Sequence, residues 1–68
     1  MELMVNGKKL EVPDGATITT VLEELNINPL RVAVQCNLEI IKRERYEETM
    51  LKSGDRLEII SFMAGGYE

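Results

Sequence analysis

Residues 1–12 of the chain read MELMVNGKKLEV. Apolar side chains alternate with their neighbours on both sides of Asn6-Gly7, which is the period-two pattern of a half-buried strand. Both central positions of a type I′ turn need a positive φ, and an Asn-Gly pair meets that need best. The stretch therefore predicts a β-hairpin over residues 1–12. Its alternating apolar positions are Met1, Leu3 and Val5 before the turn and Leu10 and Val12 after it.

A helix is predicted directly after the hairpin. Pro13-Asp14-Gly15 predicts a turn, because proline presets φ and glycine relieves the backbone. The hydroxyl of Thr17 can then accept a hydrogen bond from an unpaired N–H of the first helical turn. Asn26 is expected to adopt the left-handed conformation that ends the helix. The helical stripe that would pack on the sheet, at spacings i, i+3, i+4 and i+7, consists of Ile18, Val21, Leu22 and Leu25.

Three more strands complete the predicted sheet. The first covers residues 32–36, the second is the short pair Ile40-Ile41, and the third covers residues 56–62 after a turn at Ser53-Gly54-Asp55. The charged segment 42–48 predicts a loop or a single helical turn. The inward side chains are expected to be Val32, Val34 and Cys36 from the first of these strands, Leu57 and Ile59 from the last, and Tyr46, Met50 and Leu51 as anchors of the charged segment.

A hairpin crossed by one helix onto further strands of the same sheet is an α+β arrangement. We expect a mixed sheet of about four or five strands packed on one main helix. A chain of 68 residues has room for one domain, which we place at residues 1–63. Residues 64–68, which contain Gly65-Gly66, are expected to form a flexible C-terminal tail.

The composition limits the classes of function. The net charge is −4, from 12 acidic and 8 basic residues, and an acidic surface repels the phosphates of nucleic acids. The chain has no histidine, so it lacks the commonest general base and metal ligand, and we expect no metal site. Its one cysteine, Cys36, cannot form an internal disulfide. Because no apolar run approaches the ~20 residues that span a bilayer, and no signal-peptide pattern is seen, we expect a cytoplasmic protein that does not bind membranes.

Five motifs follow one another along the chain: Val5-Asn6-Gly7, Pro13-Asp14-Gly15-Ala16-Thr17, Val32-Ala33-Val34 before Asn37, Gly54-Asp55-Arg56-Leu57-Glu58-Ile59, and Gly65-Gly66. In this order and spacing they resemble the ThiS family, the small sulfur carrier proteins of thiamine thiazole biosynthesis. The resemblance covers residues 1–66. It implies the β-grasp fold, which the family shares with ubiquitin.

The resemblance also implies a carrier rather than an enzyme. In this family the carboxylate of the last glycine, here Gly66 after Gly65, is adenylated by an E1-type, ThiF-like adenylyltransferase that uses ATP. Sulfur from a cysteine desulfurase then displaces AMP and gives a thiocarboxylate, whose sulfur a ThiG-like thiazole synthase takes up. The carrier itself would bind no cofactor. Glycine suits this position because, without a Cβ, it can thread a narrow channel and approach a nucleotide closely.

The chain departs from the family pattern at its end, because Tyr67-Glu68 follow Gly66. As written, Gly66 has no free carboxylate. Some related sulfur carriers have a short extension that a metalloprotease removes, and we expect Tyr67-Glu68 to be such an extension. The competing interpretations are an artificial addition and a permanent block.

Four residues before the glycines are candidates for contact with a partner: Ile60, Phe62, Met63 and Ala64. Ordinary packing at the edge of the core and an apolar patch that docks the activating enzyme both explain them. Arg56 and Glu58, expected on the outer face of the last strand, would add electrostatic steering. Cys36 is expected to be a small buried apolar residue, because a sulfur-relay thiol needs exposure and a lowered pKa.

Two other functions stay open at the level of the sequence. One is a MoaD-like carrier for molybdopterin or for another thio-metabolite. Such carriers are typically longer and often have prolines before the final glycines, where this chain has Ile60-Ser61-Phe62-Met63-Ala64. The other is a ubiquitin-like interaction module without sulfur chemistry, which would be found linked to lysines of other proteins.

Overall fold

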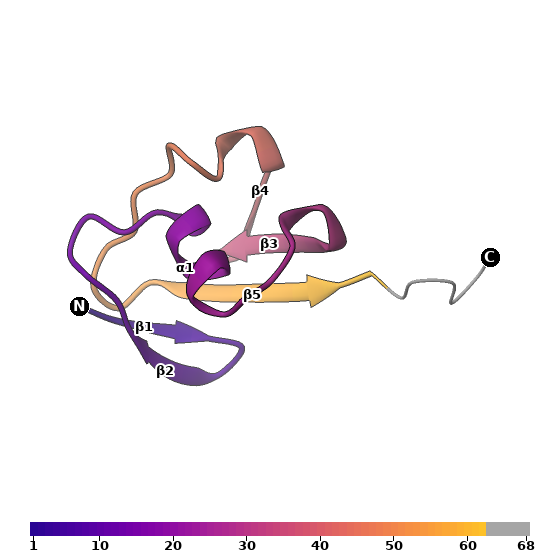
Figure 1. The fold of residues 1–68 in the computed structure, drawn as a ribbon. Helices are drawn as coiled ribbons and strands as arrows, with labels where there is room; N and C mark the ends of the chain where they lie inside the picture. Colours follow the sequence, from indigo (N-terminus) through magenta and orange to yellow (C-terminus); the bar gives the residue numbers. More distant parts are fainter. Residues whose placement is uncertain (63–68) are drawn as a thin grey trace.

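The computed structural model describes residues 1–62, which form a five-stranded sheet, one α-helix and two short 3₁₀ turns. The strand order is β2-β1-β5-β3-β4, with β5 parallel to β1 and the other neighbours antiparallel. The predicted α+β class and mixed sheet on one main helix are confirmed (Figure 1). The elements are β1 (Glu2–Val5), β2 (Lys8–Glu11), α1 (Ile18–Glu24), η1 (Pro29–Arg31), β3 (Val32–Cys36), β4 (Glu39–Ile41), η2 (Arg43–Arg45) and β5 (Arg56–Ser61).

The N-terminal hairpin forms as predicted. Leu3 pairs with Leu10 and Val5 with Lys8 across β1 and β2. Asn6 and Gly7 have φ values of 51° and 81°, as a type I′ turn requires. Leu3 and Val5 are buried, so this hairpin register points the apolar side chains of β1 toward α1.

Helix α1 begins at a capping box. The Thr17 hydroxyl accepts a hydrogen bond from the Thr20 N–H at 3.3 Å, and the Thr20 hydroxyl accepts one from the Thr17 N–H at 3.1 Å. Asn26, with a φ of 57°, turns the chain away after the helix, as predicted. The buried face of α1 consists of Ile18, Val21 and Leu22.

Leu25, the fourth member of the predicted stripe, is exposed, with 37% of its surface accessible, so its predicted place in the packed stripe is wrong. The helix ends at Glu24, and Leu25 is the C-terminal cap residue with a φ of −93°. The Ile27 N–H then donates to the Leu22 carbonyl at 2.8 Å, which brings Ile27 against the core. Ile27, and not Leu25, is therefore among the partly buried side chains that pack against the core.

The charged segment contains one 3₁₀ turn, η2, and its anchors are Tyr46 and Leu51, which are 4% and 5% exposed. Met50 is 65% exposed, so its predicted role as an anchor is wrong. Residues 49–51 run in extended conformation beside residues 16–18, because the Ile18 N–H donates to the Thr49 carbonyl and the Leu51 N–H donates to the Ala16 carbonyl. Successive side chains of an extended segment point in opposite directions, so Leu51 faces the core and Met50 does not.

The core lies between α1 and one face of the sheet. Val32 and Val34 of β3 and Leu57 and Ile59 of β5 are buried there, as predicted, and Cys36 is half-buried against the same cluster. Alternate residues of β5 face away from α1 and are exposed, which leaves the opposite face of the sheet uncovered within residues 1–62. None of the helices in this range has the length and apolar character needed to span a lipid bilayer.

Candidate functional site

The last strand, β5, leads directly to the C-terminal residues. It runs through the middle of the sheet, between β1 and β3, and ends at Ser61 (Figure 1). Several predicted site residues follow it and lie outside the described range: Met63, Ala64, Gly65 and Gly66, together with Tyr67-Glu68. The structure therefore describes only the part of the candidate site that lies at the end of β5, up to Phe62.

Ile60 and Phe62, the two predicted contact residues within the described range, are both exposed. Ile60 pairs with Ala33 of β3 and has 50% of its surface exposed, and Phe62 has 55% exposed. The Phe62 N–H donates to the Arg31 carbonyl at 2.8 Å, which extends the ladder with β3 by one bond past the end of β5. Since Ile59 is buried, the alternation of the strand places Ile60 and Phe62 on the uncovered face, in line with Arg56 and Glu58.

The side-chain amide of Asn6 holds the other edge of β5. Its Oδ1 accepts a hydrogen bond from the Ile59 N–H at 2.7 Å, and its Nδ2 donates to the Ile59 carbonyl at 3.2 Å. The Asn6 main-chain N–H donates to the Leu57 carbonyl at 2.9 Å. The chain turns away at Asn6-Gly7, so the amide group takes the place of one more peptide group of β1. Sequence reasoning used Asn6 only as a turn residue and missed this contact.

A second asparagine fixes the start of β5. The Asn37 Oδ1 accepts from the Arg56 N–H at 3.0 Å, and its Nδ2 donates to the Asp55 carboxylate at 3.0 Å. The other oxygen of Asp55 accepts from the Lys52 N–H at 2.8 Å. Side-chain amides thus bond the main chain of β5 at its start, Arg56, and at Ile59, two residues before its end.

Cys36 has the character of a structural thiol. Burial raises its pKa, and the negative charges of Asp55 and Glu39 raise it further. A thiol with a raised pKa stays protonated at neutral pH and is a poor nucleophile. This agrees with its predicted role as a small apolar residue beside the core.

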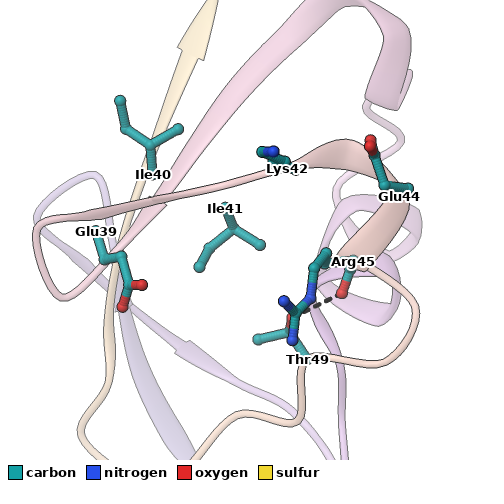
Figure 2. A pocket seen from close by; sticks show the side chains of 7 residues that line it. All are labelled: Glu39, Ile40, Ile41, Lys42, Glu44, Arg45 and Thr49. Carbon is teal, nitrogen blue, oxygen red and sulfur yellow. Dashed lines mark hydrogen bonds between the residues drawn. The ribbon is translucent and has the colours of Figure 1, made fainter.

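A hollow of about 590 Å³ lies at the other edge of the sheet, between β4 and the segment that includes η2. Figure 2 shows Glu39 and Arg45 on opposite sides of it. Arg45 forms an ion pair with Glu48 at 2.9 Å, and its carbonyl accepts a hydrogen bond from the Thr49 hydroxyl at 2.6 Å. These contacts lie within or next to the charged segment, which forms the predicted loop with a single helical turn, the 3₁₀ turn η2. Within residues 1–62, no three acidic or cysteine side chains converge on a possible metal position.

The comparisons with known proteins agree with the resemblance seen in the motifs. The model of the ThiS family matches residues 1–66. The sulfur carrier protein ThiS of Bacillus subtilis is 38% identical over 65 residues, which are 94% of this chain and 98% of that protein. The crystal structure of the thiamine biosynthesis protein ThiS of Geobacter metallireducens superposes with a TM-score of 0.82 at 36% identity, covering 97% of this chain and 100% of that one. The expected β-grasp fold is thereby confirmed.

A thiazole synthase of Paramagnetospirillum magneticum is also similar, at 36% identity over 66 residues. The match covers 97% of this chain but only 20% of that protein. The likeness is therefore to one part of a longer protein.

Proposed function

The chain belongs to the ThiS family, and on this basis we propose that it is the sulfur carrier of thiamine thiazole synthesis and that it works through the carboxylate of Gly66. The observation that carries the proposal is the extent of the family match, which runs from residue 1 to Gly66. The match stops before the two residues that depart from the family pattern.

The residue types of the chain fit the chemistry of a carrier. A carboxylate is a poor electrophile, whereas its mixed anhydride with AMP is a good one. An activating enzyme would supply the ATP and the catalytic groups, so the carrier needs no histidine, bound cofactor or metal of its own. The raised pKa of Cys36 also argues against sulfur passing through this thiol.

The partners are proposed from the same family. A ThiF-like adenylyltransferase would activate Gly66, a cysteine desulfurase would supply sulfur, and a ThiG-like thiazole synthase would receive it. The thiazole synthase of Paramagnetospirillum magneticum supports the last of these, because a segment similar to this chain occurs within a protein of that name.

Covalent geometry limits where such partners can dock. Gly66 is the fourth residue after Phe62, and four residues span at most about 14 Å. An enzyme that acts on Gly66 must therefore bring its active site within that distance of Phe62. This reach supports the proposal that Ile60 and Phe62, with Met63 and Ala64 beyond them, form the docking patch. We further propose that Arg56 and Glu58, earlier on the same face of β5, steer the encounter.

Adenylation by a purified ThiF-like enzyme tests the function, with ATP–pyrophosphate exchange as the measurement. The chain ending at Gly66 should support exchange and, with the desulfurase, gain about 16 Da as sulfur replaces oxygen. Deleting Gly66 from that chain, or changing Gly66→Val, should reduce exchange by at least about 100-fold, because the reacting carbonyl is displaced or crowded. Exchange that is unaffected by either change would contradict the proposal.

The full chain, ending at Glu68, serves to test the extension. We propose that a metalloprotease removes Tyr67-Glu68, so the full chain should be inactive in exchange until it is trimmed. Mass spectrometry of the protein from its native host gives the natural C-terminus. An active carrier that still ends at Glu68 in those cells would exclude processing.

A further inference from the structure

The β1-facing edge of β5 stays open beyond Ile59. Val5 pairs with Leu57 as the last pair between β1 and β5, and the Asn6 amide then bonds both main-chain groups of Ile59. Within residues 1–62, no strand lies opposite Ser61 on this side. In Figure 1, β5 extends past the tip of the β1–β2 hairpin.

The hydrogen-bond pattern shows which way Ser61 points. In the antiparallel ladder with β3, the Phe62 N–H donates to the Arg31 carbonyl, and the Asn37 N–H donates to the Arg56 carbonyl. Even-numbered residues of β5 therefore direct their main-chain groups toward β3, and odd-numbered ones direct them away. The N–H and C=O of Ser61 face the side where β1 has ended, and Ser61 itself is exposed.

We propose that the enzyme that activates Gly66 adds an extended segment to this edge and pairs with the main chain of Ser61. The inference rests on the proposed function: because Gly66 lies at most about 14 Å from Phe62, an enzyme that acts on Gly66 must bind close to the end of β5. A strand added at an open edge gains main-chain hydrogen bonds whatever its side chains are. Ile60 and Phe62, which flank Ser61 in the sequence, then supply the apolar contacts that select the partner.

The arrangement explains why the Asn6 contact matters. An open N–H and C=O at Ile59 would let an added strand pair at more than one register along β5. Since the Asn6 amide already occupies both groups, the first free pair is that of Ser61. The added segment is thereby aligned with the residues that lead to Gly66.

Amide hydrogen exchange in the complex tests this directly. The form of the chain that the adenylation experiment finds active is mixed with the ThiF-like enzyme, and the Ser61 amide is followed by NMR. We expect its exchange to be fast in the free protein and slowed at least about tenfold in the complex. A Ser61 amide that exchanges equally fast in both states, while Ile60 and Phe62 respond to binding, would mean that docking uses side chains alone.

Proline substitution supplies a second readout. Ser61→Pro removes the N–H that faces away from β3, so the ladder with β3 stays intact, and binding to the enzyme should weaken roughly tenfold relative to Ser61→Ala. Lys9→Pro is the matched control, since in the β1–β2 register its N–H faces the outer edge of β2; it should change binding less than about twofold. Equal binding of Ser61→Pro and Ser61→Ala would overturn the proposal. If Ser61→Pro does not fold, the exchange measurement decides.

The two proposals can fail separately. If neither the full chain nor the chain ending at Gly66 is adenylated, both the proposed function and the strand addition are excluded. If the chain is adenylated normally but exchange of the Ser61 amide is not slowed in the complex, only the strand addition is excluded.

Discussion

At Asn6, a left-handed backbone and a side-chain amide act on neighbouring parts of the sheet. The φ of 51° turns the chain out of β1, and the amide bonds the main chain of Ile59 at 2.7 and 3.2 Å. Glycine would make the same turn and aspartate would keep one of the two bonds, but only asparagine provides the turn, an acceptor and a donor together. Asparagine at this position therefore serves the hydrogen bonding of β5 as well as the turn of the hairpin.

Replacing this side chain should destabilise the fold without disturbing the turn. Asn6→Gly keeps the positive φ but leaves the Ile59 N–H and C=O without their partner, so we expect a loss of about 1–3 kcal/mol in the free energy of unfolding. Urea denaturation measures the loss, and the exchange rate of the Ile59 amide localises it.

Asn26→Gly is the control for this change. Asn26 also has a positive φ, of 57°, but its side chain makes no hydrogen bond within residues 1–62. Its replacement should alter stability by less than about 0.5 kcal/mol. Similar losses for both variants would show that backbone freedom, and not the Ile59 contact, explains the effect.

At the scale of the element, α1 depends on packing. It has only seven residues, and isolated helices of that length are unstable in water. The capping box at Thr17 and Thr20 satisfies its first N–H groups, and the apolar face of Ile18, Val21 and Leu22 joins it to the sheet.

Leu22→Ala should therefore cost about 2–5 kcal/mol in the free energy of unfolding, because Leu22 is 2% exposed and its loss leaves a cavity. Leu25→Ala, three residues further along, should cost less than half as much, since Leu25 is 37% exposed. Denaturant midpoints compare the two variants. Equal costs would mean that Leu25, as the simple helical spacing implies, is as important to the core as Leu22.

The errors of the sequence prediction share one physical cause at this scale. Leu25 is assigned to the core from helical spacing, which holds only while the helix continues, and Met50 from its apolar character beside Leu51. The helix ends before Leu25, and the segment around Met50 is extended and pairs with residues 16–18, a contact between distant parts of the chain. Where the conformation is set locally, as at Asn6-Gly7, Thr17 and Asn26, the prediction was correct.

At the scale of the whole molecule, the perturbed ionisable groups predict sensitivity to alkali. The pKa of Cys36 is raised above its ordinary value of 9.0, first by burial, and the pKa of Tyr46 is raised above 10.0, also first by burial. The folded state therefore holds these protons more tightly than the unfolded state does. The contribution of these two groups to the stability should be constant below about pH 9 and should fall as the pH rises above it.

Urea midpoints measured between neutral pH and about pH 11 test this expectation. Cys36→Ala should flatten the first part of the fall, because it removes the group that titrates first. A midpoint that rises over the same range, or a fall that is identical in the variant, would contradict the assignment.

The sequence predicts more of the overall fold than of the candidate site. Strand alternation, the turn residues and one helical stripe were enough for the α+β class, and the order of the motifs identified the family. The contacts that prepare the site were hidden, because they join positions far apart in the sequence: Asn6 with Ile59, and Asn37 with Asp55 and Arg56. Nothing in the spacing of these residues indicates that they meet.

The way in which β5 ends also affects the rate at which Gly66 can reach an active site. Because the Asn6 amide and the Arg31 carbonyl hold the main chain through Phe62, the domain and Gly66 are joined by a tether of fixed covalent length. In the proposed function, entry of Gly66 into an active site after docking is an intramolecular event, governed by an effective concentration that depends on the length of this tether. Under that proposal, a carrier that binds its activating enzyme weakly can still be activated quickly and then dissociate to meet the next enzyme.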